Sequence, residues 1–430
     1  KEWIRKKILR VNLKKVLKKK KQQKKKRRRN NFLIYKKVST LSLAIGDIIT
    51  LNVGNIANGG HFIGRHNDQI VFVRHSLTGE RANVKITAVN SKFAFGDAIE
   101  IIKKSKDRVN APCKYAHPEG CGGCDFQHID PIAQLNLKKI VIQDQFKRIA
   151  KIEINPEIIS EDSLEGLNWR TRLNLAISEN KKLGLHAHKS NKIIEIDECL
   201  IAVEGINKSE IFNKKWENED NIKISYSSDN DMNISQLGKN ISGPDKLNEV
   251  VDDNKYYISP KSFWQSHKNA PEFILEQVLK FANIKEGERV CDLYGGVGLF
   301  TLPISKILGE NGEVHLIEVN RVCIADATEM FADIKNIFIH HGTVEQKLGS
   351  IKKINTIILD PPRNGVSKQV INQMIEKKPQ TIIYVSCNPS TLARDTKILT
   401  DNNYTLTNIV GLDLFPMTHH IECVASFTKK

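Results

Sequence analysis

The second half of the chain alternates between short apolar runs and polar segments long enough to form helices. From about residue 261 the apolar runs are RVCDLYG, EVHLIEVN, INTIILDPP and TIIYVSCN. Apolar strands separated by helices are typical of a parallel sheet that is buried on both faces. We therefore predict an α/β, doubly wound domain over residues 261–430. Ligands of such sheets bind beyond the carboxyl ends of the strands.

Shorter strands alternate with turns over residues 39–104. The segments are GDIITLNVG, QIVFVRH, ANVKITAVN and DAIEIIKK, with Gly and Asn turns between them. This pattern predicts a small β-barrel of a kind that often binds oligonucleotides. An ordinary β module without a ligand fits the same pattern.

Residues 105–260 form a third region, an α+β domain that mixes one helix with short strands. The helix is predicted over residues 131–150, because Asp130 can cap it and Pro131 suits a first helical turn. We expect this helix to pack on the 261–430 domain. An apolar stripe at helical spacing marks its predicted buried face: Ile132, Leu135, Ile140, Phe146 and Ile149.

The clearest strands of this region are WRTRLNLAIS and KIIEIDECLIA. The stretch 218–254 is polar and rich in Asn and Asp, so we predict hairpin loops there.

The net charge of +17 suggests a nucleic-acid partner, but its distribution weakens that interpretation. Residues 1–38 hold 19 of the 66 Lys and Arg and one of the 49 acids. The remaining residues carry 47 bases and 48 acids, a net charge of −1. The tail is predicted to be disordered, and it either grips phosphates without specificity or has no role.

The run VCDLYGGVGLF predicts a strand, a glycine turn and a helix. Gly296 and Gly298 let the backbone pass close to a ligand. Glu318 ends the next strand, twenty residues past Gly298, where a carboxylate can accept both ribose hydroxyls of an adenosine. NAD enzymes share this spacing. S-adenosylmethionine is favoured because the loop lacks a full GxGxxG and because Asp292 can balance a cationic cofactor.

A second strand ends on Asp360, in the run IILDPPRNGV. Pro361 and Pro362 make the turn rigid. Adenine N-methyltransferases carry a related turn that is usually followed by an aromatic residue. Here Arg363 follows, which argues against amine methylation.

A third strand ends on Cys387, in TIIYVSCNPSTLARD, and Pro389 stops it. A cysteine in this place is often structural, but the polar residues behind it favour a reactive thiol beside the cofactor. Carbon 5 of uracil is too weak a nucleophile to take a methyl group directly. A thiolate that adds to carbon 6 makes carbon 5 nucleophilic, and a base must later remove the proton from carbon 5.

The segment LFPMTHHIECVASF supplies a candidate base. Glu422 interrupts an apolar strand, where a carboxylate is unfavourable unless it is paired or used, and burial would raise its pKa. A salt-bridged edge residue is the structural alternative. His419 and His420 are competing bases.

Three cysteines cluster as Cys113-x7-Cys121-x2-Cys124, and Cys199 follows in IDECLIA. The first residues lack the apolar segment and cleavage site of a secretion signal, so we do not expect disulfides. Four thiolates at this spacing fit a zinc site and a [4Fe–4S] cluster equally well.

With these motifs the chain resembles the RNA uracil-5-methyltransferases that use S-adenosylmethionine, above all their iron–sulfur branch, typified by the 23S ribosomal RNA enzymes. The most specific motifs are SCNPSTLARD, the acid-Pro-Pro-Arg turn, the FP-x-T-x-H-x-E ending and CGGCDFQH, within roughly residues 40–430. The resemblance implies a TRAM domain over 39–104, an iron–sulfur central domain and a Rossmann-like methyltransferase domain.

The resemblance also implies the roles of residues. Cys387 is the expected nucleophile and Glu422 the expected base, and a [4Fe–4S] cluster is favoured over zinc at Cys113, Cys121, Cys124 and Cys199. The expected cofactor and active-site residues are Gln265, Tyr294, Gly296, Gly298, Glu318 and Asp360. Departures from relatives occur at Gly295, often Cys, and at Leu299 and Thr343, where some have Asn.

We therefore expect methyl transfer from S-adenosylmethionine to carbon 5 of a uridine in RNA, in ribosomal RNA first and transfer RNA second. One alternative is an RNA cytosine-5-methyltransferase, although those typically place a second cysteine in the Pro-rich turn. The other is a non-catalytic RNA-binding protein. We expect a cytoplasmic monomer without a membrane span. Candidate RNA contacts are Arg170, Arg172, Arg363, Arg394 and Phe263.

Overall fold

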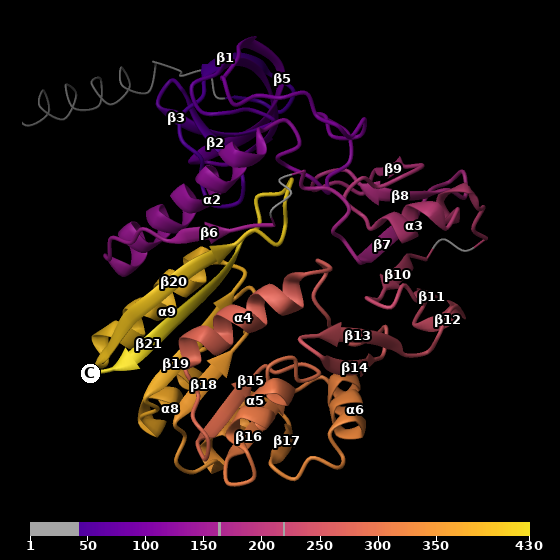
Figure 1. Ribbon diagram of the computed structural model, residues 1–430. Coiled ribbons are helices and arrows are strands. Elements are labelled where there is room, and N and C mark those ends of the chain that lie inside the picture. The colour runs from indigo at the N-terminus through magenta and orange to yellow at the C-terminus, as the bar shows by residue number, and fades with distance from the viewer. Residues whose placement is uncertain (1–42, 162–164, 218–219) are drawn as a thin grey trace, which may run out of the picture.

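The computed structural model describes residues 43–161, 165–217 and 220–430, and the predicted basic tail lies outside them. Three regions follow one another in Figure 1: a barrel at the top, an antiparallel sheet on the right and a large mixed sheet below. Across the described ranges, no helix combines the length and the apolar character that crossing a membrane requires.

The N-terminal region is a five-stranded sheet that closes into the predicted barrel. Its strands run in the order β1-β4-β5-β3-β2, with β3 and β5 parallel. The chain just after β1 pairs with β2, since the Gly54 amide donates to the Ile63 carbonyl at 2.8 Å. The strands are β1 (Ile48–Asn52), β2 (Phe62–His66), β3 (Gln69–Arg74), β4 (Arg81–Val89) and β5 (Phe93–Lys103).

Helix α2 (Pro131–Gln145) continues into a π-helical turn, η1 (Phe146–Ala150). Asp130 caps it as predicted, because its side chain accepts from the amides of Ile132 and Ala133. The predicted buried stripe is wrong in part: Ile132 and Ile140 are 59% and 44% exposed. The helix lies between two cores, so it buries two faces. Leu137 and Val141 enter the barrel core, whereas Ile142, Phe146 and Ala150 enter the core of the large sheet.

The central region is built on a six-stranded antiparallel sheet with the order β12-β11-β10-β7-β8-β9, followed by the hairpin β13–β14. The prediction of loops over 218–254 is wrong for most of that stretch. Alternate apolar residues such as Ile222, Ile224 and Ile234 bury one face of strands there. The elements are β7 (Arg172–Ile177), β8 (Leu183–His186), β9 (Ile193–Glu195), α3 (Glu204–Lys208), η2 (Ile211–Asn213), β10 (Ile222–Tyr226), β11 (Met232–Gln236), β12 (Lys239–Ser242), β13 (Leu247–Val251) and β14 (Asn254–Ile258).

The C-terminal region is the predicted α/β sheet, with strand order β17-β16-β15-β18-β19-β21-β20-β6. The chain runs outward from β15 to β17 and returns to β18 on the other side of β15, so the order reverses there. Strand β21 runs antiparallel between β19 and β20. The strands are β6 (Glu157–Ile159), β15 (Arg289–Leu293), β16 (Glu313–Glu318), β17 (Ile337–His341), β18 (Thr356–Leu359), β19 (Thr381–Ser386), β20 (Tyr404–Leu412) and β21 (Glu422–Lys429).

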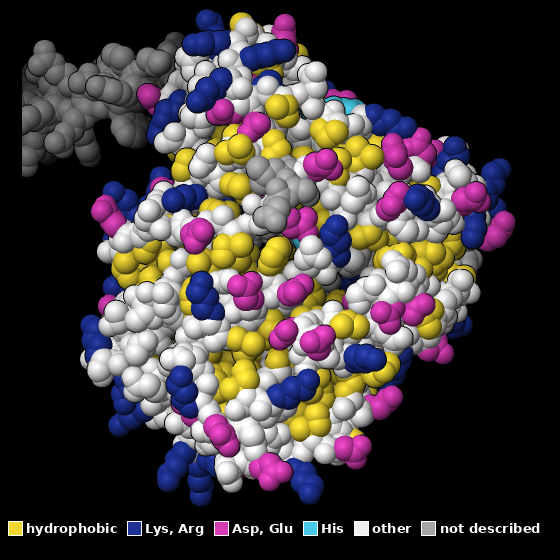
Figure 2. Space-filling view, viewed as in Figure 1, with side chains coloured by type: hydrophobic (Ala, Val, Ile, Leu, Met, Phe, Trp, Pro, Cys, Tyr) yellow, Lys and Arg dark blue, Asp and Glu magenta, His cyan; other side chains and the backbone are white. Residues whose placement is uncertain are grey.

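Helices flank this sheet on both faces (Figure 1). They are α4 (Ala270–Ala282), α5 (Thr301–Leu308), α6 (Arg321–Met330), α7 (Val344–Lys347), η3 (Leu348–Ser350), α8 (Lys368–Lys377) and α9 (Pro389–Asp401). On the face shown in Figure 2, Lys and Arg side chains are interspersed with Asp and Glu, in keeping with the near-zero charge of the chain beyond its tail.

Candidate active site

Three of the predicted site residues lie at neighbouring strand ends of the large sheet. Asp292 lies in β15, Asp360 follows β18 and Cys387 follows β19. These strands are parallel and adjacent, so their carboxyl ends share one edge, beside the point where strand order reverses. The edge is therefore the place where this fold binds ligands.

Cys387 and Glu422 face each other across two paired strands. Ser386 of β19 pairs with Cys423 of the antiparallel strand β21. Cys387, the residue after Ser386, therefore lies opposite Glu422, the residue before Cys423. Burial raises the pKa of the Cys387 thiol to about 11, and the nearby carboxyls of Glu422 and Asp360 add to this. The positive charge of Arg363 lowers the pKa of this thiol. A thiol and a carboxyl thus share one small site with a guanidinium.

The carboxyl group of Glu422 is 5% exposed, and its Oε1 atom is buried without a hydrogen-bond partner. Burial raises the pKa of Glu422 well above the usual value, and the Asp360 carboxyl raises it further. The positive charge of Arg363 lowers it in part. The salt-bridged edge residue that the sequence left open is not what the structure contains, because no ion pair to Glu422 occurs within the described residues. A carboxylate in this setting is a stronger base than an exposed one.

The glycine turn after β15 bends around the buried carboxyl of Asp292. Tyr294, Gly296 and Gly298 all have positive φ angles, of 60°, 57° and 91°. A side chain at position 298 would put its Cβ 2.6 Å from the ring of Phe331, so only glycine fits there. The backbone of this turn is therefore exposed to a neighbouring ligand without side chains in the way.

Asp292 lies fully inside this turn. Its Oδ2 atom accepts a hydrogen bond from Thr301 Oγ1 at 2.6 Å, and its Oδ1 atom has no partner. Burial raises the pKa of Asp292 to about 7. Burial likewise raises the pKa of Asp360 to about 7, with a contribution from the Asp292 charge. Two acids with elevated pKa values thus lie where a cationic group would relieve their repulsion.

Glu318, at the end of β16, binds the loop amides. Its Oε2 accepts from the Gly296 amide at 3.0 Å, and its Oε1 accepts from the amides of Val319 and Asn320 at 2.8 and 2.7 Å. This carboxylate therefore fixes the glycine turn to the next strand. Each oxygen keeps acceptor capacity for a hydroxyl.

Gln265 is buried and lines a cavity of about 630 Å³, together with Thr171, Tyr226 and His267. None of Asp292, Asp360 or Glu422 lines this cavity. Asp360, Cys387 and Glu422 thus share one site, and the cofactor role of Gln265 stays a prediction.

The two competing bases have other contacts. His419 Nδ1 lies 2.5 Å from Asp125 Oδ2, and Arg74 approaches the same carboxylate at 3.7 Å. His420 packs edge-on against Phe415, and burial lowers its pKa to about 3. The sequence analysis missed Asp125, although its position directly after CGGC was a usable signal.

The four candidate metal-binding cysteines line one small cavity together with Arg170: they are Cys113, Cys121, Cys124 and Cys199. The Gly123 amide donates to the sulfur of Cys121 at 3.3 Å. Within the described ranges, no three His, Cys, Asp or Glu side chains converge closely enough to hold a single metal ion. Four thiols are a donor set that suits a thiolate-bound group.

Four of the candidate RNA contacts divide into two groups, and the fifth, Arg170, lines the cysteine cavity. The guanidinium of Arg172 is buried and donates to the Ser262 carbonyl at 2.9 Å, and Arg394 binds Asp395 and the carbonyls of Asn364 and Val366. These two hold the framework. Phe263 is 62% exposed and Arg363 is exposed beside the thiol, so both are open to a ligand.

Comparisons with known proteins agree with this geometry. Residues 244–430 match the profile of the family described as tRNA (Uracil-5-)-methyltransferase, and residues 43–99 match the TRAM domain. A protein of Streptomyces avermitilis named as an RNA methyltransferase is 34% identical, over 89% of this chain and 98% of its own length. A Corynebacterium glutamicum protein named likewise is 30% identical, over 91% and 99%.

Among solved structures, the tRNA (uracil-54, C5)-methyltransferase of Pyrococcus abyssi, in complex with S-adenosyl-L-homocysteine, matches with a TM-score of 0.67 and 22% identity. The match covers 88% of this chain and 100% of that one. At this identity the likeness establishes the fold, an α/β methyltransferase fold preceded by the barrel.

Proposed function

Since the chain belongs to the tRNA (uracil-5-)-methyltransferase family of S-adenosylmethionine-dependent RNA methyltransferases, we propose that it methylates carbon 5 of a specific uridine through a covalent adduct with Cys387. The observation that supports this most is the opposition of Cys387 and Glu422 across β19 and β21. One thiol and one buried carboxyl are what the chemistry at carbon 5 requires.

The reaction proceeds in four steps. The Cys387 thiolate adds to carbon 6 of uracil, the double bond between carbons 5 and 6 opens, and the electron pair is held as an enolate. Carbon 5 would then take the methyl group that the sulfonium of S-adenosylmethionine supplies, and the carbon–sulfur bond electrons would stay on sulfur as a neutral thioether. Glu422 removes the proton from carbon 5. The electron pair re-forms the double bond, and Cys387 leaves as a thiolate.

The environment of the thiol matches this sequence of events. Arg363 favours the thiolate, whereas Glu422 and Asp360 oppose it, so a neutral Asp360 would aid the first step while Glu422 stays a carboxylate that can act as the base. The partnerless Oε1 of Glu422 offers a lone pair to the carbon-5 proton. A base with a raised pKa holds that proton until it can pass to solvent.

The turn at Tyr294, Gly296 and Gly298, with Glu318 and Asp360, would hold S-adenosylmethionine, which supplies the methyl group as a sulfonium. The support lies in the amide-lined turn and in the orphaned Oδ1 of Asp292. Asp292 and Asp360 compensate positive charge at this edge. Glu318 orients the turn while keeping acceptor capacity for ribose hydroxyls.

We propose that the four cysteines hold a [4Fe–4S] cluster, with zinc as the alternative. The four thiols line one cavity, and thiolates are ligands that both groups take. The resemblance of CGGCDFQH to the iron–sulfur branch favours the cluster over zinc. The proposed role is to brace the fold, because methyl transfer involves no net redox change.

Ribosomal RNA, of the 23S type, is the proposed substrate because the cysteine set is the feature shared with that branch. Transfer RNA is the second candidate. The test is tritium release from [5-³H]uridine-labelled transcripts of each RNA in the presence of S-adenosylmethionine. Release from one of them, lost in Cys387→Ala, is expected. Release from cytidine-labelled RNA only, or from neither RNA, would contradict the proposal.

A further inference from the structure

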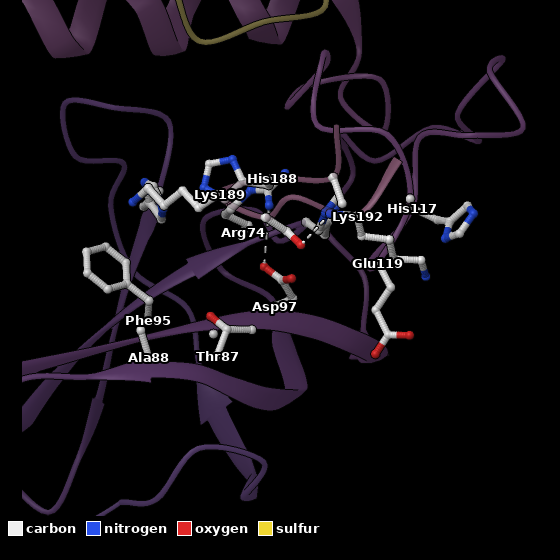
Figure 3. A pocket seen from close by; sticks show the side chains of 16 residues that line it. Arg74, Thr87, Ala88, Phe95, Asp97, His117, Glu119, His188, Lys189 and Lys192 are labelled. Atoms are coloured by element: carbon white, nitrogen blue, oxygen red, sulfur yellow. Dashed lines mark hydrogen bonds and ion pairs between the residues drawn. The ribbon is translucent and has the colours of Figure 1, made fainter. Parts of the chain in front are cut away.

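A cavity of about 570 Å³ lies between the barrel and the central sheet, away from the strand-end acids (Figure 3). Barrel residues, among them Arg74, Phe95 and Asp97, form one wall. The turn between β8 and β9 forms the other, with His188 and Lys189. The size falls within the range of about 300–1,000 Å³ that is usual for small-ligand sites. No part of the methyl-transfer chemistry uses this cavity.

One side of the cavity is aromatic and uncharged. The ring of Phe95 stacks on Phe72 at 5.4 Å and meets the edge of His61 at 5.3 Å. Burial lowers the pKa values of His61 and His188 to about 4, so both imidazoles are neutral at pH 7. The Lys189 ammonium lies 4.6 Å from the centre of the Phe95 ring on an exposed side chain, so a base that stacks there would displace it. Such a wall can stack on a nucleobase.

The same cavity holds positive groups with unused donors. The side chain of Arg74 is 8% exposed, and its carboxylate neighbours, Asp125 and Asp97, lie 3.7 and 3.9 Å away, beyond hydrogen-bond distance. Its Nε atom is buried and has no hydrogen-bond partner. A buried guanidinium with an unused N–H donor is unfavourable unless a ligand accepts a hydrogen bond from that donor.

Two lysines add to this charge. Neither Lys189 nor Lys192 forms an ion pair with a carboxylate of the described chain, whereas Lys85 nearby is paired with Glu119 at 2.7 Å. The cavity therefore combines an aromatic wall with two lysines that lack a carboxylate partner and with Arg74, which has an unused donor and also neutralises Asp97 in the same wall. A peptide or a small carboxylate would use the cations alone and leave the aromatic wall without a partner.

We propose that this cavity binds one unpaired nucleotide of the RNA substrate, with its base against Phe95 and His61 and its phosphate at Arg74, Lys189 and Lys192. This inference depends on the proposed RNA substrate and adds to it a second contact, outside the target uridine. Arg74 also reaches Asp125, which binds His419, three residues before Glu422. The cavity is thus connected by adjacent side chains to the active-site edge.

Single-stranded RNA fits the cavity better than a duplex. Proteins read RNA sequence mainly through unstacked bases, and aromatic side chains are the usual platforms for them. A base in a duplex is already stacked and could not enter between Phe95 and His188. The expected ligand is therefore a nucleotide from a loop or a bulge.

The test measures binding without turnover. Fluorescein-labelled oligouridylate of 12 nucleotides and a 12-base-pair RNA duplex serve as probes of the full-length protein in anisotropy titrations. Phe95→Leu is expected to weaken single-strand binding by about tenfold, the typical effect of losing one stacked base. Lys189→Ala and Lys192→Ala are each expected to lower the slope of log K against log salt by about 0.7. The control is Lys239→Ala, exposed on β12, which should change neither quantity.

Equal affinity of Phe95→Leu and the wild-type protein for the single strand would overturn the inference. So would a preference for the duplex. Affinity for S-adenosylhomocysteine and the melting temperature check that each variant is folded. Because these titrations need no methyl transfer, a protein that binds the oligonucleotide as expected but releases no tritium would disprove the proposed function and leave the cavity assignment intact. If the wild-type protein releases tritium and Phe95→Leu binds the oligonucleotide as well as the wild type, the proposed function stands and the cavity assignment is wrong.

Discussion

The Nδ1 atom of His419 lies 2.5 Å from the Oδ2 atom of Asp125, and this contact ties the cysteine region to the segment that precedes Glu422. Asp125 follows Cys124 directly, and its amide also donates to the Met417 carbonyl at 3.1 Å. The position of the proposed base therefore depends on residues that adjoin the proposed cluster.

Asp125→Asn should lower kcat more than it raises KM, because it loosens the segment that positions Glu422 without touching the thiol. It should also destabilise the fold by about 1–3 kcal/mol, the usual effect of leaving a buried polar partner unmet. Steady-state kinetics and urea unfolding measure the two effects. Asp401→Asn is the matched control, since its pair with Lys397 is exposed and its loss should leave both quantities nearly unchanged. An unchanged kcat in Asp125→Asn would show that the contact does not position the base.

Cys387→Ala should abolish covalent capture of 5-fluorouridine RNA and reduce turnover by at least about a thousandfold. The fluorine at carbon 5 cannot leave as a proton does, so the wild-type enzyme stalls as an adduct. Denaturing gel electrophoresis detects that adduct. The neighbouring buried thiol supplies the control: Cys423→Ala should still form it. An adduct in Cys387→Ala would assign the nucleophile elsewhere.

Glu422→Gln should slow the removal of the carbon-5 proton while leaving the earlier steps possible. Turnover should fall by about 10² to 10⁴-fold, the range typical of a lost general base. The methylated adduct should then accumulate even with ordinary uridine RNA, which a denaturing gel with a methyl-labelled cofactor can show. Loss of turnover without any adduct would instead show that Glu422 is needed for the thiolate attack or for an earlier step.

Adduct formation should become faster with rising pH. The pKa of Cys387 is about 11, so the thiolate fraction of the free enzyme rises about tenfold per pH unit throughout the range below that value. Single-turnover capture of 5-fluorouridine RNA between about pH 6.5 and 8.5 measures the slope. Arg363→Gln removes the group that lowers this pKa. The variant should therefore form the adduct more slowly at each pH, with a similar dependence of the rate on pH. A rate independent of pH would mean that the thiol is already ionised.

The four-cysteine set predicts iron and sulfide in protein purified without oxygen, four of each per chain for a [4Fe–4S] cluster. Metal and sulfide analysis separates this outcome from zinc, which would bring no sulfide. Cys199→Ser should lose the bound metal and melt at a lower temperature, because the thiols hold distant segments together. Full occupancy in Cys199→Ser would remove this residue from the ligand set.

The strand ends of the large sheet were predictable because they depend on local pattern. Apolar runs followed by Asp360 and Cys387 place those side chains on one edge whenever the strands are parallel and adjacent. What the sequence could not give is the antiparallel entry of β21 beside β19, which sets Glu422 opposite Cys387. The order of strands in a sheet is a long-range property, and no local spacing encodes it.

The features that local pattern missed have the same physical origin. The face of α2 was assigned from one apolar stripe, but tertiary packing gives this helix two buried faces, so Ile132 and Ile140 remain exposed. The predicted ribose acceptor Glu318 proved to bind loop amides as well, which only the folded turn creates. The cavity between Arg74 and Lys189 joins two regions far apart in the sequence, and neither region alone suggested it.

Helix α2 packs into the barrel core through Leu137 and Val141 and into the sheet core through Phe146. The barrel is therefore not a module on a tether that can be trimmed away. A truncated protein starting after β5 would present an apolar helix face to water, and it should aggregate rather than survive as a minimal methyltransferase.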